Sequence, residues 1–405
     1  MSSTVDAQSL IVIPACAVAA PLIADRALRW LAVPTVVFEI LLGVIVGPDV
    51  LGWASSDDLI AALSDFGLAM LMFLAGYEID FVRLRGGPLG RALTAWAVTL
   101  AAALGFGALV NPKPLDGAFA GLVLTTTALG TILPILRDSG ELPTPFGAMT
   151  MATGAVGEFG PIVAIAVLLS GNSPARSAVI LGAFALITVV AIGYARRPRP
   201  AWATRLIRRT LRTSGQFAIR LVFLVLAAMV AAALWLDLDM LLGAFTAGIV
   251  CRLLLADVAE AEEELIEAKL EGVGFGFLVP VFFVVSGMNF DLKALLKDPG
   301  TLLLVPVFLG LLALVRGVPV ALLAPPGLRA RERASLGLYG ATALPLVVVI
   351  TGIEVDAGHL RSSTAAALVG AGMLSVLVFP LLAQRLRGER PVTPVEGPRV
   401  RAESW

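Results

Sequence analysis

Apolar runs of about 20 residues alternate with short polar breaks along nearly the whole chain. A helix of that length crosses a hydrocarbon layer of roughly 30 Å, and the core of a soluble protein does not need such runs repeatedly. Each run, bounded by charged residues or by proline and glycine, therefore predicts one membrane-spanning helix of an all-α polytopic protein. The thirteen predicted segments cover residues 9–25, 33–53, 58–78, 91–110, 115–137, 146–170, 176–195, 217–236, 239–255, 272–290, 301–324, 334–355 and 362–384.

Composition supports the membrane class. Of 405 residues, 58% are hydrophobic and 15% are charged, against roughly 25% charged in globular proteins. The mean hydropathy is +0.91. Cys16 and Cys251 both fall inside apolar segments, so the sequence implies no disulfide framework. We expect no cofactor and no nucleic-acid partner.

Basic residues are sorted by loop, which predicts an orientation. With the N-terminus placed outside, the cytoplasmic loops and the C-terminal tail hold 24 of the 30 Lys and Arg residues, and the outer loops hold five. Positive charge accumulates on the cytoplasmic side of membrane proteins, so we expect the N-terminus outside and the C-terminus inside. Eight arginines within residues 196–220 favour an anchor that meets lipid headgroups. The acidic run Asp257–Glu271 predicts the solvated face of a short amphipathic helix.

Two charged residues lie inside otherwise apolar segments. Glu158 falls in the middle of residues 149–170, and Arg316 is the only charge in residues 301–324. Burying an ionised group in hydrocarbon costs several kcal/mol, so such a residue marks a functional site by default. One buried acid and one buried base predict an ion pathway with a charge partner. The alternative is a structural salt bridge between two helices.

Three short motifs recur in the same order in the two halves of the chain. Leu41-Leu42-Gly43 matches Leu241-Leu242-Gly243, residues 73–80 match residues 283–291, and Thr127-Ala128-Leu129 matches Thr342-Ala343-Leu344. The matched segments lie seven spans apart, and because seven is odd the two copies must cross the membrane in opposite directions. Such inverted repeats are typical of secondary transporters, whose sites lie near the midplane on discontinuous helices.

Segments five and twelve are predicted to be the discontinuous helices. The residues expected to interrupt them are Thr125, Thr126, Thr127, Gly130 and Pro134 in the first, and Gly340, Thr342 and Pro345 in the second. Proline inside a helix removes a hydrogen bond, which a membrane tolerates only where a neighbour or a cavity satisfies the freed carbonyl. Simple proline kinks are the alternative for each helix taken alone. Hydroxyls and carbonyls at such breaks are oxygen ligands of the kind that a hard cation prefers.

The sequence resembles the second family of monovalent cation:proton antiporters, whose bacterial members exchange Na⁺ or K⁺ for H⁺. The stretches that carry the resemblance follow the family order over nearly the whole chain: Pro34 to Gly43, Gly47 to Gly52, Phe73 to Asp80, Thr126 to Pro134, Leu242 to Phe245 and Gly276 to Phe283. The resemblance implies the sodium/proton antiporter fold, with a core domain around two crossed broken helices and a separate dimerisation domain. It also implies a homodimer in the inner (plasma) membrane of a bacterial cell.

These implications divide the chain into six parts. We assign residues 1–90 and 217–300 to dimerisation-domain helices, 91–170 and 301–387 to the two core transport halves, 171–216 to a linker helix with its basic loop, and 388–405 to a disordered cytoplasmic tail.

The resemblance also implies roles for the buried charges. Family members carry Asp-Asp, Asn-Asp or Gln-Asp on the helix after the first broken one, where this chain has Gly157-Glu158. The resemblance therefore implies Glu158 as the proton and cation site and Arg316 as its charge partner. Thr126, Thr127, Gly130, Pro134, Thr342 and Pro345 are the expected ligand-bearing positions of the broken helices.

The predicted function is exchange of Na⁺ or K⁺ for H⁺ by alternating access. Because arginine keeps its proton in proteins, a single cycling carboxylate predicts electroneutral exchange. Two alternatives stay open: a proton-coupled carrier of an anion or a small organic solute, and a sensor or channel on an antiporter scaffold. An intramembrane enzyme is disfavoured, since the spans contain no paired aspartates and the single histidine, His359, lies in a predicted outer loop.

Overall fold

All the regular secondary structure in the described part of the chain is helical. The computed structural model describes residues 6–28, 35–79, 87–110, 117, 121–142, 144–168, 174–197, 201–211, 213–256, 258, 260–297 and 299–387. The helices of the first half are α1 (Ala7–Leu28), α2 (Thr35–Val46), α3 (Asp58–Tyr77), α5 (Gly87–Val110), α7 (Leu129–Asp138), α8 (Pro145–Leu168), α9 (Pro174–Ala195) and α10 (Ala201–Thr210).

The second half continues with α-helices and two π-helical turns. In order these are α11 (Phe217–Trp235), α12 (Met240–Leu255), α13 (Glu260–Val273), η1 (Gly274–Leu278), α14 (Val279–Met288), α15 (Leu292–Lys297), α16 (Pro299–Leu311), η2 (Leu312–Gly317), α17 (Val318–Leu322), α18 (Ala330–Ala341), α19 (Pro345–Asp356) and α20 (Ser362–Arg387). Both π turns come just before a proline, Pro280 and Pro319, which cannot donate to the carbonyl four residues earlier.

The described helices include eight that are long and apolar enough to cross a membrane, and three shorter apolar ones. The all-α polytopic prediction is thus confirmed. One boundary differs: α13, η1 and α14 form a continuous helical run, so the predicted short acidic helix is the first part of the following span. The prediction placed a break near Gly272, but no proline stops the helix there. The predicted tail, residues 388–405, and part of segment five lie outside the described residues.

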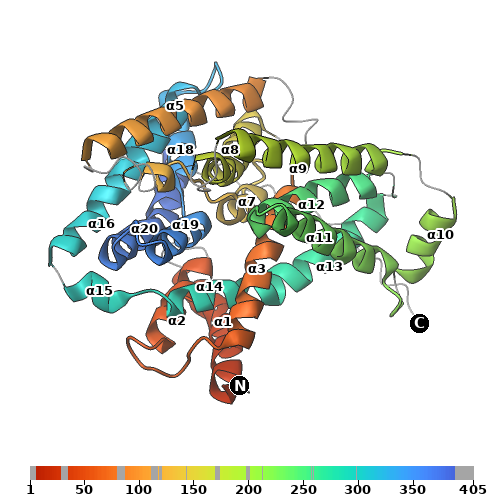
Figure 1. Cartoon of the computed structure of the whole chain (residues 1–405), viewed down its shortest axis with the longest axis horizontal. Helices are drawn as coiled ribbons and strands as arrows, with labels where there is room; N and C mark the ends of the chain where they lie inside the picture. The colour runs from red at the N-terminus through yellow and green to blue at the C-terminus, as the bar shows by residue number, and fades with distance from the viewer. Residues whose placement is uncertain are drawn as a thin grey trace.

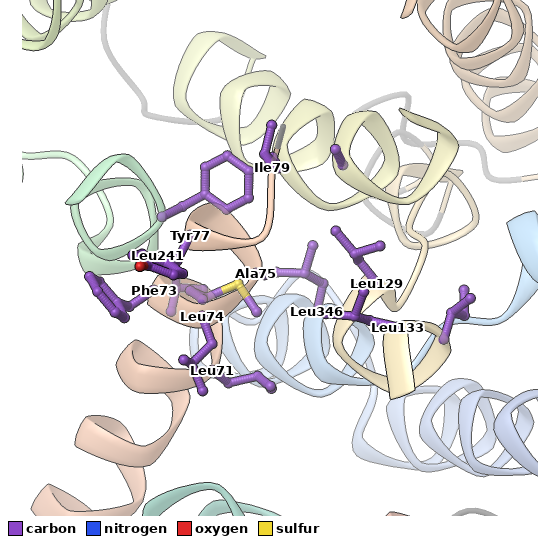
Figure 2. Close-up of a cluster of buried hydrophobic side chains, with 14 of the residues drawn as sticks. Leu71, Phe73, Leu74, Ala75, Tyr77, Ile79, Leu129, Leu133, Leu241 and Leu346 are labelled. Carbon is purple, nitrogen blue, oxygen red and sulfur yellow. The ribbon is translucent and has the colours of Figure 1, made fainter. Parts of the chain in front are cut away.

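The helices pack in two groups (Figure 1). One group joins α1, α2 and α3 to α11, α12 and α14, while the other joins α5 and α8 to α16, α18 and α20. α7 contacts both α8 and α3. Figure 2 shows the buried cluster where the groups meet, with Leu71 of α3, Leu129 of α7, Leu241 of α12 and Leu346 of α19. The start of α7, at Leu129, therefore lies in the interior of the molecule.

The repeated segments pack against one another in a crosswise manner. α2 of the first repeat lies along α14 of the second, and α3 of the first lies along α12 of the second. The α2–α14 contact is tight enough to require glycine, because a Cβ on Gly287 would meet the carbonyl oxygen of Ile40 at 2.1 Å. Exchanging the two repeats turns the α2–α14 contact into the α12–α3 contact, which is the relation expected for inverted repeats.

Gly287→Ala should therefore destabilise the protein by about 1–3 kcal/mol, since an added methyl group would force two backbones apart. Thermal melting of the purified protein in mild detergent measures the effect. Gly310→Ala is the matched control: a Cβ on Gly310 of α16 meets nothing within 4 Å, and alanine favours a helix by roughly 0.5–1 kcal/mol. Equal melting of the two variants would show that the α2–α14 contact is not tightly packed.

Contacts between loops agree with the predicted sides of the membrane. Lys293, in a predicted outer loop, and Asp49, near the outer end of the second predicted segment, form an ion pair of 3.2 Å. Arg387 and Glu141, from the C-terminal end of α20 and the predicted cytoplasmic loop before α8, form another of 2.5 Å. Segments predicted to lie on one side are therefore neighbours in space.

Candidate functional site: the crossing of two broken helices

The first break follows residues Gly121–Val123 and ends where α7 begins at Leu129. The side chains of Thr125 and Thr126 donate to the carbonyls of Leu122 and Val123, both at 2.8 Å. Such local side-chain bonds compete with the helix ladder and satisfy carbonyls at its end. The threonine run therefore explains why the chain leaves the helix here.

The second break separates α18 from α19. α18 ends at Ala341, Thr342 is extended (φ −68°, ψ 119°), and α19 begins with Pro345 in its first turn, a position where proline loses no helical hydrogen bond. The backbone N–H of Ala343 donates to Ser375 of α20 at 2.9 Å. A neighbouring helix thus satisfies a backbone group that the break leaves free.

The two breaks touch each other at equivalent positions of the repeats. The backbone N–H of Ala128 donates to the carbonyl of Thr342 at 2.7 Å. The hydroxyl of Thr127 donates to the carbonyl of Gly340 at 2.6 Å. The predicted crossing of two broken helices is therefore present, and simple proline kinks do not describe it.

Glu158 lies on α8 beside this crossing. Its side chain is 1% exposed, and neither carboxylate oxygen has a hydrogen-bond partner. The backbone N–H groups of Leu129 and Gly130, in the first turn of α7, favour the negative charge of the Glu158 carboxylate. A helix N-terminus favours a negative charge, because its first N–H groups have no partner within the helix. The start of α7 therefore faces the acid with the favourable end of its dipole.

Arg316 lies in the π turn η2 and is fully buried. Its Nε donates to the Thr127 hydroxyl at 2.9 Å, and one terminal nitrogen donates to the carbonyl of Thr153 at 2.9 Å. The other terminal nitrogen has no hydrogen-bond partner. Arg316 therefore lies at the crossing, and its bonded partners are Thr127 and Thr153. The Glu158 oxygens are not bonded to it.

Gly157 provides the space for this arginine. A Cβ on Gly157 would lie 2.3 Å from the Thr127 hydroxyl oxygen and 2.4 Å from a terminal nitrogen of Arg316. Any side chain at position 157 would therefore displace the guanidinium or the broken helix. Arg316 and Thr127 thus occupy the volume that a side chain at position 157 would need.

The other predicted site residues differ in what they contribute to the crossing. Thr126 and Thr342 donate their hydroxyl protons to carbonyls of their own helices, at 2.8 and 3.1 Å, and each oxygen keeps lone pairs that can ligate a cation. Gly130 packs against Leu71 of α3. Pro134 is part of α7, with its side chain outside what the structure describes, and Pro345 starts α19.

Sequence reasoning missed two contributors to the site. Thr153 acts through its backbone carbonyl, which no side-chain pattern reveals. Ser375 lies on α20, far along the chain from the break that it supports. A signal for Ser375 did exist, since it is a buried hydroxyl in a predominantly apolar helix.

A buried acid and base at the crossing of two discontinuous helices from inverted repeats define a polytopic membrane protein of the secondary-transporter class. The family model described as "Sodium/hydrogen exchanger, transmembrane" matches residues 15–386. The chain belongs to this family.

Individual relatives share only a modest sequence identity with this chain. YjbQ of Bacillus subtilis (strain 168) is 25% identical over 405 residues, covering 95% of this chain and 64% of YjbQ, so the chain spans less than two thirds of that relative. The Na(+)/H(+)-K(+) antiporter GerN of Bacillus cereus is 24% identical over 356 residues, covering 86% of this chain and 88% of GerN. The structure of the sodium proton antiporter MjNhaP1 from Methanocaldococcus jannaschii matches with a TM-score of 0.65 at 16% identity, covering 94% of this chain and 99% of the other. This likeness supports the fold.

Proposed function

We propose that the protein exchanges a monovalent cation, Na⁺ or K⁺, for H⁺ across the membrane by alternating access. The observation that carries the proposal is the Glu158 carboxylate, which is fully buried without a hydrogen-bond partner where the two broken helices cross. A group in that position can hold a proton or a cation, and the two compete for it. The names of relatives such as GerN support the same pair of ions.

The oxygen atoms at the crossing of the two broken helices suit a hard cation. We assign the hydroxyl oxygens of Thr126 and Thr342 and the carbonyl of Gly130 as further ligands. Pro134 has no N–H to offer that carbonyl four residues earlier. Oxygen donors of this kind are the ones that hard metal ions prefer. The Thr127 hydroxyl is already bonded to two protein groups.

Exchange should be electroneutral. We assign the transported ions to one carboxylate at the crossing, that of Glu158. Arg316 stays protonated through the cycle. One proton then crosses for each cation. In proteoliposomes with an imposed cation gradient, a potential-sensitive dye should report no change of membrane voltage while a pH dye reports exchange. A voltage that builds up with the cation gradient would require a second titrating group.

The packing of the helices supports a division of the protein into two domains. We assign α1–α3 and α11–α14 to a dimerisation domain, and the group around α5, α8, α16, α18 and α20 to a core that carries the site. The protein would act as a homodimer in a bacterial inner membrane, with the N-terminus outside and the C-terminus in the cytoplasm. The loop contacts of Asp49 and of Glu141 support a consistent assignment of sides.

Flux through the purified protein tests the proposal. Proteoliposomes loaded at low pH are diluted into Na⁺, K⁺ or Li⁺ in parallel, with choline as the control cation. An exchanger releases protons only when a suitable cation is supplied. Proton release without a counter-ion would indicate a channel, and no movement with any of the three would indicate a sensor or a carrier of another solute.

A further inference from the structure

Two opposite charges in this site are not bonded to each other, although each has buried polar atoms without a hydrogen bond. One terminal nitrogen of Arg316 and both carboxylate oxygens of Glu158 are buried without a hydrogen bond. An unpaired charge in the interior costs several kcal/mol, so the two groups have a strong drive to form an ion pair. The guanidinium lies against Gly157, the residue next to Glu158. Other contacts must therefore keep the Arg316 guanidinium from pairing with the Glu158 carboxylate.

Two bonds hold Arg316 in its position. Its Nε donates to the Thr127 hydroxyl, and a terminal nitrogen donates to the Thr153 carbonyl, both at 2.9 Å. Thr127 is itself fixed on both sides. Its hydroxyl proton goes to the Gly340 carbonyl at 2.6 Å, and its backbone N–H goes to the Gly157 carbonyl at 3.0 Å.

The direction of the Thr127 hydroxyl matters for this arrangement. A hydroxyl has one proton and two acceptor lone pairs. Because the proton is given to Gly340 of the second broken helix, a lone pair is available to accept from Arg316. The chain Arg316–Thr127–Gly340 therefore links η2 to both broken helices.

We propose that Thr127 is a positioning residue that restrains Arg316 from pairing with Glu158, so that the carboxylate stays open to a cation. This inference rests on the proposed function and deepens it. Arg316 supplies a fixed positive charge at the site, and Gly157 supplies the room in which Thr127 can hold it.

Removing the hydroxyl should close the carboxylate to cations. Thr127→Val keeps nearly the same volume but leaves Nε of Arg316 without its acceptor. The guanidinium is then free to turn to Glu158, and a cation must break an ion pair before it binds. A hydrogen bond to a charged group is worth about 1.5–3 kcal/mol, so the KM for the cation should rise about tenfold or more. The maximal rate should change much less.

Thr127→Ser is the matched variant, because serine keeps the hydroxyl and should keep the KM of the wild type. Thr131→Val is the control for loss of a nearby hydroxyl, since the Thr131 hydroxyl donates to the Ala128 carbonyl of its own turn. Equal KM values for the valine and serine variants at position 127 would overturn the restraint.

Thr127 could also raise KM by being a direct ligand, and a double-mutant cycle separates the two roles. In an Arg316→Met background, Thr127→Val should have no further effect on KM if it acts through the arginine. A full additional increase in KM in that background would overturn the proposal.

A structural measurement decides the matter without transport. In a cryo-EM map of cation-free Thr127→Val, Arg316 should lie within hydrogen-bond distance of Glu158. An arginine that stays on the Thr153 carbonyl in that map would contradict the restraint. If the wild type moves no cation, the proposed function fails, and this map still tests the position of Arg316.

Discussion

Glu158→Gln should abolish cation:proton exchange while the protein still folds and inserts. Glutamine has nearly the same size and can hydrogen-bond, but it cannot bind and release a proton or present a negative charge to a cation. Because the described residues place no second buried acid at the crossing, we expect flux to fall to the level of empty vesicles. Proton flux in proteoliposomes, with a Na⁺ or K⁺ gradient, measures the loss.

The control for this variant is Glu264→Gln. Glu264 is exposed on α13, a helix whose main contacts are with α11 and η1, and its loss should leave flux unchanged. Melting and elution profiles of both variants should match those of the wild type. If the Glu158 variant retained more than a small fraction of cation-dependent flux, the transported proton would have to bind elsewhere.

Arg316→Ala should be the most destabilising substitution in the site. The side chain is fully buried and holds Thr127 and Thr153, so its removal leaves a cavity, a stranded carbonyl and an acid without its fixed positive neighbour. Removing one charged member of a buried arrangement costs about 3–5 kcal/mol. Thermal melting in detergent and in lipid nanodiscs should show a large decrease in melting temperature.

Arg331→Ala is the matched control, because Arg331 lies exposed near the start of α18. A surface substitution of this kind changes stability by at most about 0.5 kcal/mol. Should Arg316→Ala melt at the same temperature as Arg331→Ala, the guanidinium would not be a structural link between the broken helices.

The two broken helices were predictable because their signal lies in residue types and order. Threonine, glycine and proline recur at 125–134 and 340–345, and the pairing of the two stretches in the repeats indicated that they meet. The structure joins them through Ala128 and Thr342. Segment lengths and the position of the buried charges follow from hydrophobicity alone.

The partners of the buried charges were not predictable. The sequence suggests that Glu158 and Arg316 form a pair, since opposite charges in hydrocarbon attract. The structure shows instead that Arg316 bonds a hydroxyl and a backbone carbonyl. Every residue has a carbonyl, so which one accepts is decided by three-dimensional packing and not by residue identity. The space at Gly157 is likewise visible only when η2 is placed against α8.

Proton release on cation binding tests the central claim most directly. The claim is that Glu158 holds either a proton or a cation. Adding Na⁺ or K⁺ to the wild-type protein in weakly buffered nanodiscs, at a pH where the site is protonated, should release one proton for each cation bound. The Glu158→Gln variant should release none. Saturable cation binding to the wild type without any release of protons would contradict the account.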